Sequence, residues 1–435
     1  MLYYSTNKKA PAASLHEVVS KGLAPDGGLY LPGELGALPV DFFNRMYEMD
    51  LQDIALQIAT QFLGDDVPES ELKSMVYDTL DFPIPLVPIH DQLYTLELFH
   101  GPTMAFKDVG ARFMARLLGY FTNRSQQELN VLVATSGDTG SAVANGFYKV
   151  PGIRVFVLYP KGLVSSIQEK QFTTLGENIT ALEVEGTFDD CQAMVKSAFA
   201  DDELNRQMKL TSANSINWAR LLPQSFYYFW GLAQMGRKAG EIVCAVPSGN
   251  FGNICAGLIA RRMGLPITRF IAATNINDVI PQYLQTGQFH PRASVATLAN
   301  AMDVGNPSNF ARILELYGNS LQNISNDVEG FVCTDDLILT TIKDVYSQHE
   351  YLLDPHGAIG YRALKDYQDR CSSGTKGFFI ETAHPAKFTD VVQDVIGENI
   401  PLPQNLARFA DGMKQTVEMS ATFDALKNFL TSNSI

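Results

Sequence analysis

A lysine at the start of an apolar helix is the first residue whose type and setting point to chemistry. Lys107 follows Met104-Ala105-Phe106 and precedes a stretch, 109–121, whose apolar residues recur at helical spacing. An amine in such a setting, near the positive end of a helix, has a depressed pKa and becomes a better nucleophile toward a carbonyl cofactor. The commoner role of a single lysine is a solvated surface group, here with Asp108 as its ion-pair partner.

A glycine-containing turn after a buried strand is the second candidate. The strand EIVCAVP (241–247) leads through this turn into an apolar helix, and the turn reads Ser248-Gly249-Asn250-Phe251-Gly252-Asn253. Its two glycines let backbone amides point into a concavity, and the helix N-terminus adds partial positive charge, as a phosphate cradle requires. It lacks the Gly-Lys-Ser/Thr of a Walker A loop, and the next strand ends in Thr274-Asn275 instead of a ribose-binding acid. A glycine turn without a ligand is the alternative.

A second turn of this kind joins another strand to a helix and reads Thr135-Ser136-Gly137-Asp138-Thr139-Gly140-Ser141. Its hydroxyls and amides could hold a small anion such as a carboxylate. The carboxylate of Asp138 would repel that anion unless it faces away or bonds the loop's own amides. A helix N-cap rich in serine and aspartate is the ordinary interpretation.

The segment SANSINWAR (212–220) supplies a cation. Arg220 falls near the first turn of an apolar helix, where a positive charge is unfavourable to the helix dipole by a few tenths of a kcal/mol. An anion at that helix end would remove the conflict, and Asn214, Ser215 and Asn217 stand beside it. An arginine folded onto a neighbouring carboxylate is the ordinary explanation.

Short apolar strands alternate with amphipathic helices beyond residue 95, which predicts parallel sheets with helices on both faces. The predicted helices are 109–121, 141–149, 189–199 and 253–263, and the predicted strands are 129–135, 153–160, 179–186, 241–247, 267–274 and 377–383. These units exceed one sheet of ordinary size. Ligands of such sheets bind at the carboxyl ends of strands, where both glycine turns lie.

The first 95 residues are predicted to be mainly helical, with helices at 51–63 and 69–80 and a capping box at Ser14 and Glu17. Prolines in DFPIPLVPIH (81–90) argue against a helix or a central strand, so we expect a connector there. We therefore expect an α/β protein with two α/β domains. The expected divisions are a helical segment at 1–95, a smaller α/β domain at 96–215 and a larger one at 216–435.

Composition excludes several classes of protein. The 435 residues include 33 Lys and Arg against 47 Asp and Glu, a formal charge of −14, which argues against nucleic acid or an anionic membrane surface as a partner. Five scattered cysteines and seven histidines show no disulfide framework and no metal-ligand spacing. Without a membrane-length apolar run or an evident signal peptide, we expect a reduced, cytoplasmic protein.

Seven segments, taken together and in order, resemble the threonine synthases, which are pyridoxal-phosphate enzymes of fold type II. They span nearly the whole chain: GLAPDGGLYLP (22–32), HGPTMAFKD (100–108), ATSGDTGSA (134–142), YPKGLVSSIQEKQ (159–171), SANSINWAR (212–220), PSGNFGN (247–253) and ETAHPAKF (381–388). The resemblance implies two α/β domains, with the larger one binding pyridoxal 5'-phosphate (PLP).

The same resemblance assigns roles to residues. It implies that Lys107 is the catalytic lysine, covalently linked to PLP, that the turn Ser248 to Asn253 holds the cofactor phosphate, and that a Thr382 hydroxyl meets the pyridine nitrogen. For the substrate, it implies that the carboxylate contacts Thr135, Ser136, Asp138 and Thr139. It implies that the substrate phosphate contacts Ser215, Asn217, Arg220 and Lys161. No role for His384 or Lys387 beyond packing and turn formation follows from the sequence.

The reaction that this resemblance implies converts O-phospho-L-homoserine and water to L-threonine and phosphate, by β,γ-elimination and replacement. A phospho-lyase of the same family would instead release 2-oxobutyrate. A serine or threonine dehydratase would need no site for a substrate phosphate. A nucleotide-dependent oxidoreductase and a non-catalytic binding protein are the remaining alternatives, against which the missing ribose acid and the presence of Lys107 respectively argue. Either a monomer or a homodimer is compatible with the sequence.

Overall fold

The computed structural model describes all residues from 1 to 435 except 126–127, 238–239, 372–373 and 433–435. The described chain divides into two compact units that are discontinuous in sequence. Unit 1 comprises Met1, Leu31–Phe106 and Leu221–Pro401, and unit 2 comprises Leu2–Tyr30, Lys107–Arg220 and Leu402–Ile435. These units differ from the contiguous divisions at 95/96 and 215/216, because strands pair across long stretches of sequence that a linear pattern does not reveal.

Unit 2 is built on a parallel sheet of five strands in the order β13-β7-β6-β5-β8. The strands are β5 (Leu129–Ala134), β6 (Ile153–Pro160), β7 (Ile179–Glu185), β8 (Leu210–Ser212) and β13 (Val417–Ser420). Its helices are α1 (Leu15–Lys21), α5 (Lys107–Ser125), α6 (Asp138–Gly146), α7 (Ser166–Thr173), α8 (Phe188–Ala200), α9 (Asp202–Gln207), α19 (Gln404–Ala410) and α20 (Phe423–Ser432). Apolar side chains of β5, β6 and β7 pack against α8 and α20 to form a core that includes Leu132, Phe156, Leu182, Met194 and Leu426.

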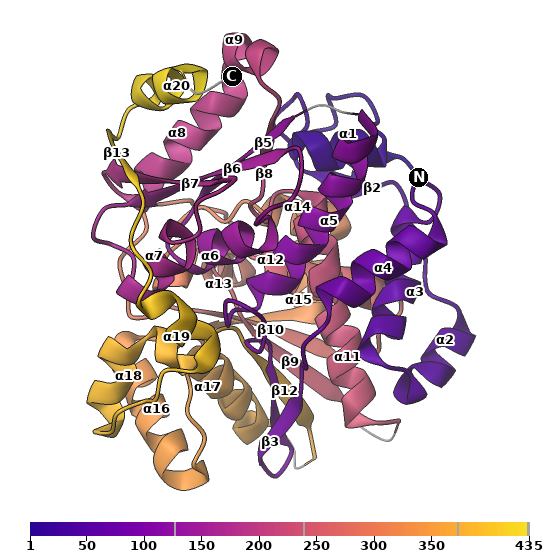
Figure 1. The fold of residues 1–435 in the computed structure, drawn as a ribbon. Coiled ribbons are helices and arrows are strands. Elements are labelled where there is room, and N and C mark those ends of the chain that lie inside the picture. Colours follow the sequence, from indigo (N-terminus) through magenta and orange to yellow (C-terminus); the bar gives the residue numbers. More distant parts are fainter. Residues whose placement is uncertain (126–127, 238–239, 372–373, 433–435) are drawn as a thin grey trace. The chain divides into compact units, whose positions relative to one another are not determined.

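Unit 1 is built on a sheet of six strands in the order β11-β10-β9-β12-β4-β3, parallel except for the antiparallel pair of β3 and β4. The strands are β3 (Leu86–His90), β4 (Leu93–Glu97), β9 (Ile242–Pro247), β10 (Arg269–Thr274), β11 (Val328–Val332) and β12 (Lys376–Glu381). The helix α17 (Pro355–Arg370) packs against β9 and β12 (Figure 1).

The other helices of unit 1 are α2 (Val40–Arg45), α3 (Leu51–Leu63), α4 (Glu69–Thr79), α11 (Phe226–Met235), α12 (Gly252–Arg262), α13 (Val279–Thr286), α14 (Phe310–Leu316), α15 (Leu321–Asp327), α16 (Asp335–His349) and α18 (Thr389–Ile396). Single 3-10 turns lie at Met46–Glu48, Leu222–Ser225, Asn300–Met302 and Pro385–Lys387. The short strands β1 (Tyr3–Ser5) and β2 (Tyr30–Pro32) pair with each other, and α10 (Trp218–Leu221) crosses from unit 2 to unit 1.

The six strands predicted from apolar runs are present as β5, β6, β7, β9, β10 and β12, so the expected α/β fold with mainly parallel sheets is confirmed. The predicted capping box of α1 is formed by Ser14 and Glu17, and the helix ends at Gly22 with a φ of 76°. The connector expected at 81–90 is partly wrong, because Leu86–His90 forms β3. This strand tolerates Pro88 since it lies at the edge of the sheet, where one side of its backbone needs no partner.

Candidate active site

The residues that precede Lys107 are tied to the end of β12 in unit 1. The Phe106 amide donates to the Thr382 carbonyl at 2.8 Å, and the His384 amide donates to the Met104 carbonyl at 3.1 Å. Ala105 forms an isolated antiparallel bridge with Ala383, between these two hydrogen bonds. The peptide bond between Phe106 and Lys107 therefore starts from a segment fixed against the carboxyl end of the central strand.

Two residues for which the sequence offered no role complete this anchor. The buried Nζ of Lys387 donates to the Thr103 carbonyl at 2.9 Å. The His384 ring accepts a hydrogen bond from the Ala386 amide through Nδ1 at 3.0 Å and so begins the 3-10 turn. Burial, then the charge of His100, lowers the pKa of His384 to about 4. Both residues hold the chain that leads to Lys107.

Lys107 is the first residue of α5 and is partly buried, with Asp108 buried beside it. The helix begins at the lysine itself, slightly before the predicted start. The first turn of a helix carries partial positive charge from amides that have no acceptor within the helix. This end of α5 therefore has the electropositive setting that the sequence predicted for the lysine.

Gly110, one turn after Lys107, determines where Arg220 lies. A Cβ atom at Gly110 would lie 2.9 Å from the Arg220 carbonyl oxygen and 3.3 Å from its Nε. Residues three apart share a helix face, so the 2%-exposed Arg220 packs against α5 one turn from the lysine, and both belong to unit 2. Gly110 was missed by sequence reasoning. A glycine inside a helix costs roughly 1 kcal/mol relative to alanine. Its presence within the predicted helix is the sequence feature that indicates a close approach of another backbone segment.

The segment before Arg220 is folded by its own asparagines. The Asn217 side-chain amide donates to the Val19 carbonyl at 2.9 Å and the Ser212 carbonyl at 3.2 Å, and its Oδ1 accepts from the Ala219 amide at 3.0 Å. Asn214 donates to the Ala134 carbonyl at 3.1 Å, while Ser215 is partly buried. The structure therefore gives Asn217 a holding role in this loop and leaves its predicted substrate contact a prediction.

The apolar helix predicted after Arg220 is divided into α10, a 3-10 turn at Leu222–Ser225 and α11. Pro223 lies in the middle turn, and a proline lacks the N–H that a continuous α-helix would use there. Arg220 therefore belongs to a helix of only four residues, in which the macrodipole is small.

The turn from Thr135 to Ser141 joins β5 to α6 at the carboxyl edge of the sheet in unit 2. The Thr135 hydroxyl accepts hydrogen bonds from the Gly137 amide at 2.9 Å and the Gly140 amide at 2.8 Å. The carboxylate of the buried Asp138 accepts from the Gln168 side chain at 2.7 Å. Thr135 and Asp138 thus shape the turn, and the predicted contacts of Thr135, Ser136, Asp138 and Thr139 with a substrate carboxylate stay predictions.

Gln168, which the sequence analysis did not single out, covers this turn. A Cβ atom at Gly137, where φ is 141°, would lie 2.6 Å from the Gln168 side chain. The Gln168 carbonyl also accepts from the Ser141 hydroxyl at 3.1 Å, and Ser165 donates to Gln168 Oε1 at 2.9 Å. Its signal in the sequence is the pair Gln168 and Gln171, three apart and therefore on one face of α7.

The turn from Ser248 to Asn253 joins β9 to α12 in unit 1. The Ser248 hydroxyl donates to Asn253 Oδ1 at 2.9 Å, and Asn253 donates to the Pro247 carbonyl at 2.7 Å. Asn250 is held from a second segment, because its Oδ1 accepts the Ser308 amide at 2.6 Å and its carbonyl accepts Asn309 Nδ2 at 3.1 Å. These side chains fix the turn from within, which leaves its backbone amides as the groups that could meet a ligand.

Two conformational features of this turn fit a phosphate. A Cβ atom at Gly249 would lie 2.7 Å from Met302 Cα and 2.9 Å from the Ala301 carbonyl oxygen, so only glycine allows this path. Phe251 is left-handed, with a φ of 60°, immediately before α12 begins at Gly252. The amides of the first helical turn have no acceptor within the helix, and with the dipole they form an anion site.

Thr382 lies at the same edge of the same sheet. It follows Glu381, the last residue of β12, and β12 runs parallel to β9, so the carboxyl ends of both strands face one edge. Thr382 is buried. Unit 1 therefore brings together the turn from Ser248 to Asn253, Thr382 and the anchored segment that ends at Phe106.

Lys161 follows β6 at the carboxyl edge of the sheet in unit 2, the same edge at which the turn from Thr135 to Ser141 follows β5. It is 45% exposed, and its Nζ pairs with Glu418 at 3.0 Å. That hydrogen bond raises the pKa of Lys161 and keeps the amine charged. The ion pair with β13 gives Lys161 a surface role in the structure, and its contact with a substrate phosphate stays a prediction.

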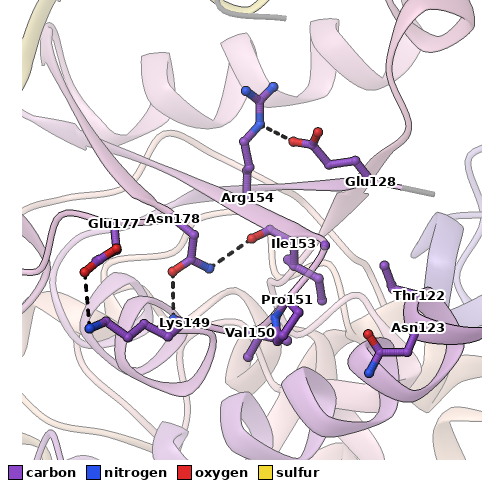
Figure 2. Close-up of a pocket in the computed structure, with 11 residues that line it drawn as sticks. Thr122, Asn123, Glu128, Lys149, Val150, Pro151, Ile153, Arg154, Glu177 and Asn178 are labelled. Atoms are coloured by element: carbon purple, nitrogen blue, oxygen red, sulfur yellow. Dashed lines mark hydrogen bonds and ion pairs between the residues drawn. The ribbon is translucent and has the colours of Figure 1, made fainter. Parts of the chain in front are cut away.

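A pocket of about 730 Å³ in unit 2 lies at the amino ends of β5, β6 and β7, at the sheet edge opposite to the turn from Thr135 to Ser141 (Figure 2). Its charged side chains pair with one another, Arg154 with Glu128 at 2.5 Å and Lys149 with Glu177 at 3.2 Å. Asn178 also lines the pocket, and its Oδ1 accepts a hydrogen bond from the Lys149 amide at 2.7 Å. These pairings leave it without the convergent unsatisfied groups of an active site.

Comparison with known proteins decides the family. Residues 82–381 match the family model described as pyridoxal-phosphate dependent enzyme, and residues 2–80 and 357–430 match the models for the threonine synthase N terminus and C terminus. The chain is 41% identical over 434 residues to threonine synthase of Escherichia coli strain K12, with 100% of both chains covered. It is 42% identical over 431 residues to that of Serratia marcescens, covering 99% of each.

The chain belongs to the threonine synthase family. Solved structures agree: threonine synthase from E. coli superposes with a TM-score of 0.93 at 40% identity, covering 99% of this chain and 100% of that one. PLP-bound threonine synthase from Brucella melitensis gives the same TM-score at 34% identity, covering 100% and 99%. The chain is therefore a PLP-dependent lyase, and the expected cofactor is confirmed.

Likeness to other PLP enzymes is one of fold alone. Threonine deaminase isoform 2 from Solanum lycopersicum, at 16% identity, superposes over 86% of this chain with a TM-score of 0.56. Membership of the threonine synthase family thus favours the synthase reading over a dehydratase or an oxidoreductase. Among the residues that the structure describes, no group of His, Cys, Asp and Glu is arranged to hold a metal ion, and no helix could span a membrane.

Proposed function

We propose that this chain converts O-phospho-L-homoserine and water to L-threonine and phosphate. The observation that carries the proposal is the placement of Arg220 against Gly110, one turn from Lys107. A substrate that carries both an α-amino acid group and a phosphate needs a cation at a fixed distance from the reacting carbon. Family membership supports the same substrate.

Lys107 acts as the base in this proposal. It is the residue that bonds the cofactor aldehyde, and the anchor at Phe106 and Thr382 fixes the backbone from which its side chain extends. PLP supplies the electron sink that makes the Cα and Cβ protons of the substrate removable. The Lys107 amine takes the Cα proton, as a general base within reach of that carbon.

The turn from Ser248 to Asn253 holds the cofactor phosphate through the amides of Gly249, Asn250, Phe251 and Gly252. The side chains of Ser248 and Asn253 hold the turn itself. Thr382 offers a hydroxyl to the pyridine nitrogen. A hydroxyl stabilises a protonated ring nitrogen less than a carboxylate would, which suits chemistry that must lead to Cγ as well as Cα.

The substrate is held at its two charged ends by unit 2. Ser136, Thr139 and the amides at the start of α6 bind the carboxylate, while Thr135 and Asp138 keep the turn in shape. Arg220 and Ser215 bind the phosphate, and Asn217 holds their loop against Val19. When a Cβ proton leaves, the γ-phosphate is expelled, and Arg220 stabilises the charge that develops on it. Protonation at Cγ, addition of the water oxygen at Cβ and return of a proton from Lys107 to Cα then give threonine.

The setting that we propose for this activity is the cytoplasm, with the chain as a monomer or a homodimer. The five cysteines are all free and four are buried, as suits a reducing compartment. The partners of the chain are then a small-molecule substrate and PLP.

The experiment that tests this proposal replaces Arg220 by alanine and measures turnover of O-phospho-L-homoserine. We expect kcat/KM to fall by about a hundredfold or more, because a charge-assisted contact to a leaving phosphate is lost. Arg206→Ala, an exposed arginine of α9, is the matched control and should retain wild-type rates. Unchanged kcat/KM in Arg220→Ala would favour a dehydratase, which needs no phosphate site.

A further inference from the structure

A buried cluster of carboxyl and imidazole groups lies behind the end of β12 in unit 1. Glu381, Asp354 and His356 are each at most 2% exposed. Glu381 immediately precedes Thr382, and in the sheet it is paired in register with Glu97 of β4. Three carboxyl groups thus meet next to the residue that we assign to the cofactor ring.

Asp354 has the donors that an ionised carboxylate needs. It is the N-cap of α17, and its side chain accepts hydrogen bonds from the His356 amide at 2.8 Å and the Gly357 amide at 3.3 Å. The His356 ring approaches the same carboxylate through Nδ1. A carboxylate at the positive end of a 16-residue helix is further stabilised by the dipole.

The carboxylate of Glu97 likewise has a hydrogen-bond partner at each of its oxygens. Its Oε1 accepts the Tyr351 hydroxyl at 2.8 Å, and its Oε2 lies 2.7 Å from His100 Nε2. Two of the three carboxyl groups are therefore matched with donors through both of their oxygens.

Glu381 differs from both. Its Oε1 accepts the Asp354 amide at 2.9 Å, but within the described part of the chain its buried Oε2 receives no N–H or O–H donor. That oxygen lies against α17, where a Cβ atom at Gly357 would be 1.7 Å away. The Asp354 carboxylate lies at the same glycine, because its Oδ2 accepts the Gly357 amide at 3.3 Å. Two acceptors that face each other without a donor are compatible only when one of them carries a proton.

We propose that Glu381 is a positioning residue held as the neutral acid, whose O–H donates to Asp354. This proposal deepens the proposed function, since it rests on Thr382 facing the cofactor ring. With a proton on Glu381, no negative charge of this residue is buried next to Thr382. The pyridine nitrogen of the cofactor then faces a neutral hydroxyl that has a neutral carboxyl group behind it. The same hydrogen bond ties the end of β12 to α17 and so fixes Thr382 and, through its hydrogen bond with Phe106, the segment that ends at Phe106.

Burial is the main cause that raises the pKa of Glu381 well above its usual range, and the negative charges of Asp354 and Glu97 add to it. The hydrogen bond from the Asp354 amide acts in the opposite direction. Burial, then the negative charge of Glu97, raises the pKa of Tyr351, so this phenol is a neutral neighbour of the cluster. The titratable groups around Glu381 are Asp354, His356, Glu97, His100, Tyr351 and His384.

The proton can be observed directly by infrared difference spectroscopy of the full-length protein, first without PLP and then with it. At pH 8 we expect the carbonyl stretch of a protonated carboxyl group in the wild type. The band should be absent from Glu381→Gln and present in Glu71→Gln, a control on the exposed side of α4. No such band, or a band that persists in Glu381→Gln, would overturn the proposal.

Rescue by the isosteric amide separates this role from simple packing. Glutamine can donate to Asp354 as a neutral acid does, so Glu381→Gln should keep the wild-type melting temperature and PLP affinity, whereas Glu381→Ala should lose both. A Glu381→Gln protein as impaired as Glu381→Ala would contradict a neutral donor. Neither readout involves the substrate, so failure here is distinguishable from failure of the proposed reaction.

Discussion

The Arg220 carbonyl oxygen lies 2.9 Å from the point where a side chain on Gly110 would begin. This contact holds the segment that carries Arg220 against α5. Lys107 lies one turn before Gly110 in the same helix. The base and the phosphate-binding cation of the proposed reaction are therefore positioned by a single close approach of backbone to backbone, within unit 2.

Gly110→Ala should separate these two groups. The added methyl group would overlap the Arg220 carbonyl oxygen, which is a backbone atom and cannot turn aside as a side chain can, so α10 must shift. We expect kcat/KM for O-phospho-L-homoserine to fall by about tenfold to a hundredfold, because a misplacement of about 1 Å has such effects. Gly119→Ala in the same helix is the control, since its Cβ would meet only the tip of the Val150 side chain at 3.2 Å. Equal rates in both variants would contradict the positioning role.

Lys107→Ala should abolish turnover, with a loss of more than about a thousandfold from removal of the base. The visible absorbance that depends on the lysine should disappear, while PLP remains bound through the turn at Ser248 to Asn253. Steady-state kinetics and absorption spectra of the purified variant measure both effects. Lys196→Ala, an exposed lysine of α8, should behave as the wild type. Wild-type turnover in Lys107→Ala would refute the assignment of the base.

Gly249→Ala should weaken cofactor binding specifically. Its methyl group would lie 2.7 Å from Met302 Cα, so the turn must move and its amides lose their common focus. A loss of about 1–3 kcal/mol is typical of such backbone strain, which corresponds to a rise in Kd for PLP of about fivefold or more. Titration of the apoprotein with PLP measures it. Gly36→Ala, where the nearest contact is 3.5 Å, should leave Kd unchanged, and a normal Kd in Gly249→Ala would argue against this turn as the phosphate site.

Acid should weaken unit 1 through His384. Burial and the charge of His100 lower the pKa of the ring from 6.5 to about 4. Between those values the unfolded chain binds a proton that the folded chain does not, so the free energy of unfolding falls as the pH drops from 6.5 to 4. One group contributes at most about 1.4 kcal/mol per pH unit. Urea unfolding at pH 7.5 and pH 5 should show a smaller difference for His384→Asn, which retains a capping oxygen, than for the wild type. The exposed His290→Asn should match the wild type, and an unchanged difference in His384→Asn would contradict the buried neutral imidazole.

The strands that are buried on both faces of a sheet were predictable, because such a strand consists of a continuous run of apolar residues. All six such runs, for example 153–160 and 241–247, are strands in the structure. In the two main sheets, the strands that were not predicted are β3, β4, β8, β11 and β13. They are short or contain or border on polar residues, and pairing with a distant partner decides their conformation. The same long-range pairing makes both units discontinuous, which no local pattern expresses.

The residues of the candidate site also differ in whether the local sequence predicts them. Residue type and turn chemistry made Lys107, Arg220 and the turn at 248–253 candidates beside their ordinary structural explanations, and the resemblance of seven segments to one family favoured the functional roles. The supporting hydrogen bonds were missed where they depend on a partner far away in sequence. Gln168 reaches across to Asp138, Asn217 bonds Val19, and Lys387 bonds Thr103. Such pairings appear only once the chain is folded.

The central claim is tested most directly by product analysis after PLP-loaded protein is given O-phospho-L-homoserine. We predict L-threonine and inorganic phosphate in equal amounts, with the threonine hydroxyl oxygen derived from water. Phosphate together with 2-oxobutyrate and ammonia would contradict the synthase and indicate a phospho-lyase that uses the same cofactor site. Release of no phosphate, with PLP visibly bound, would contradict the assignment of Arg220 and its neighbours to a substrate phosphate.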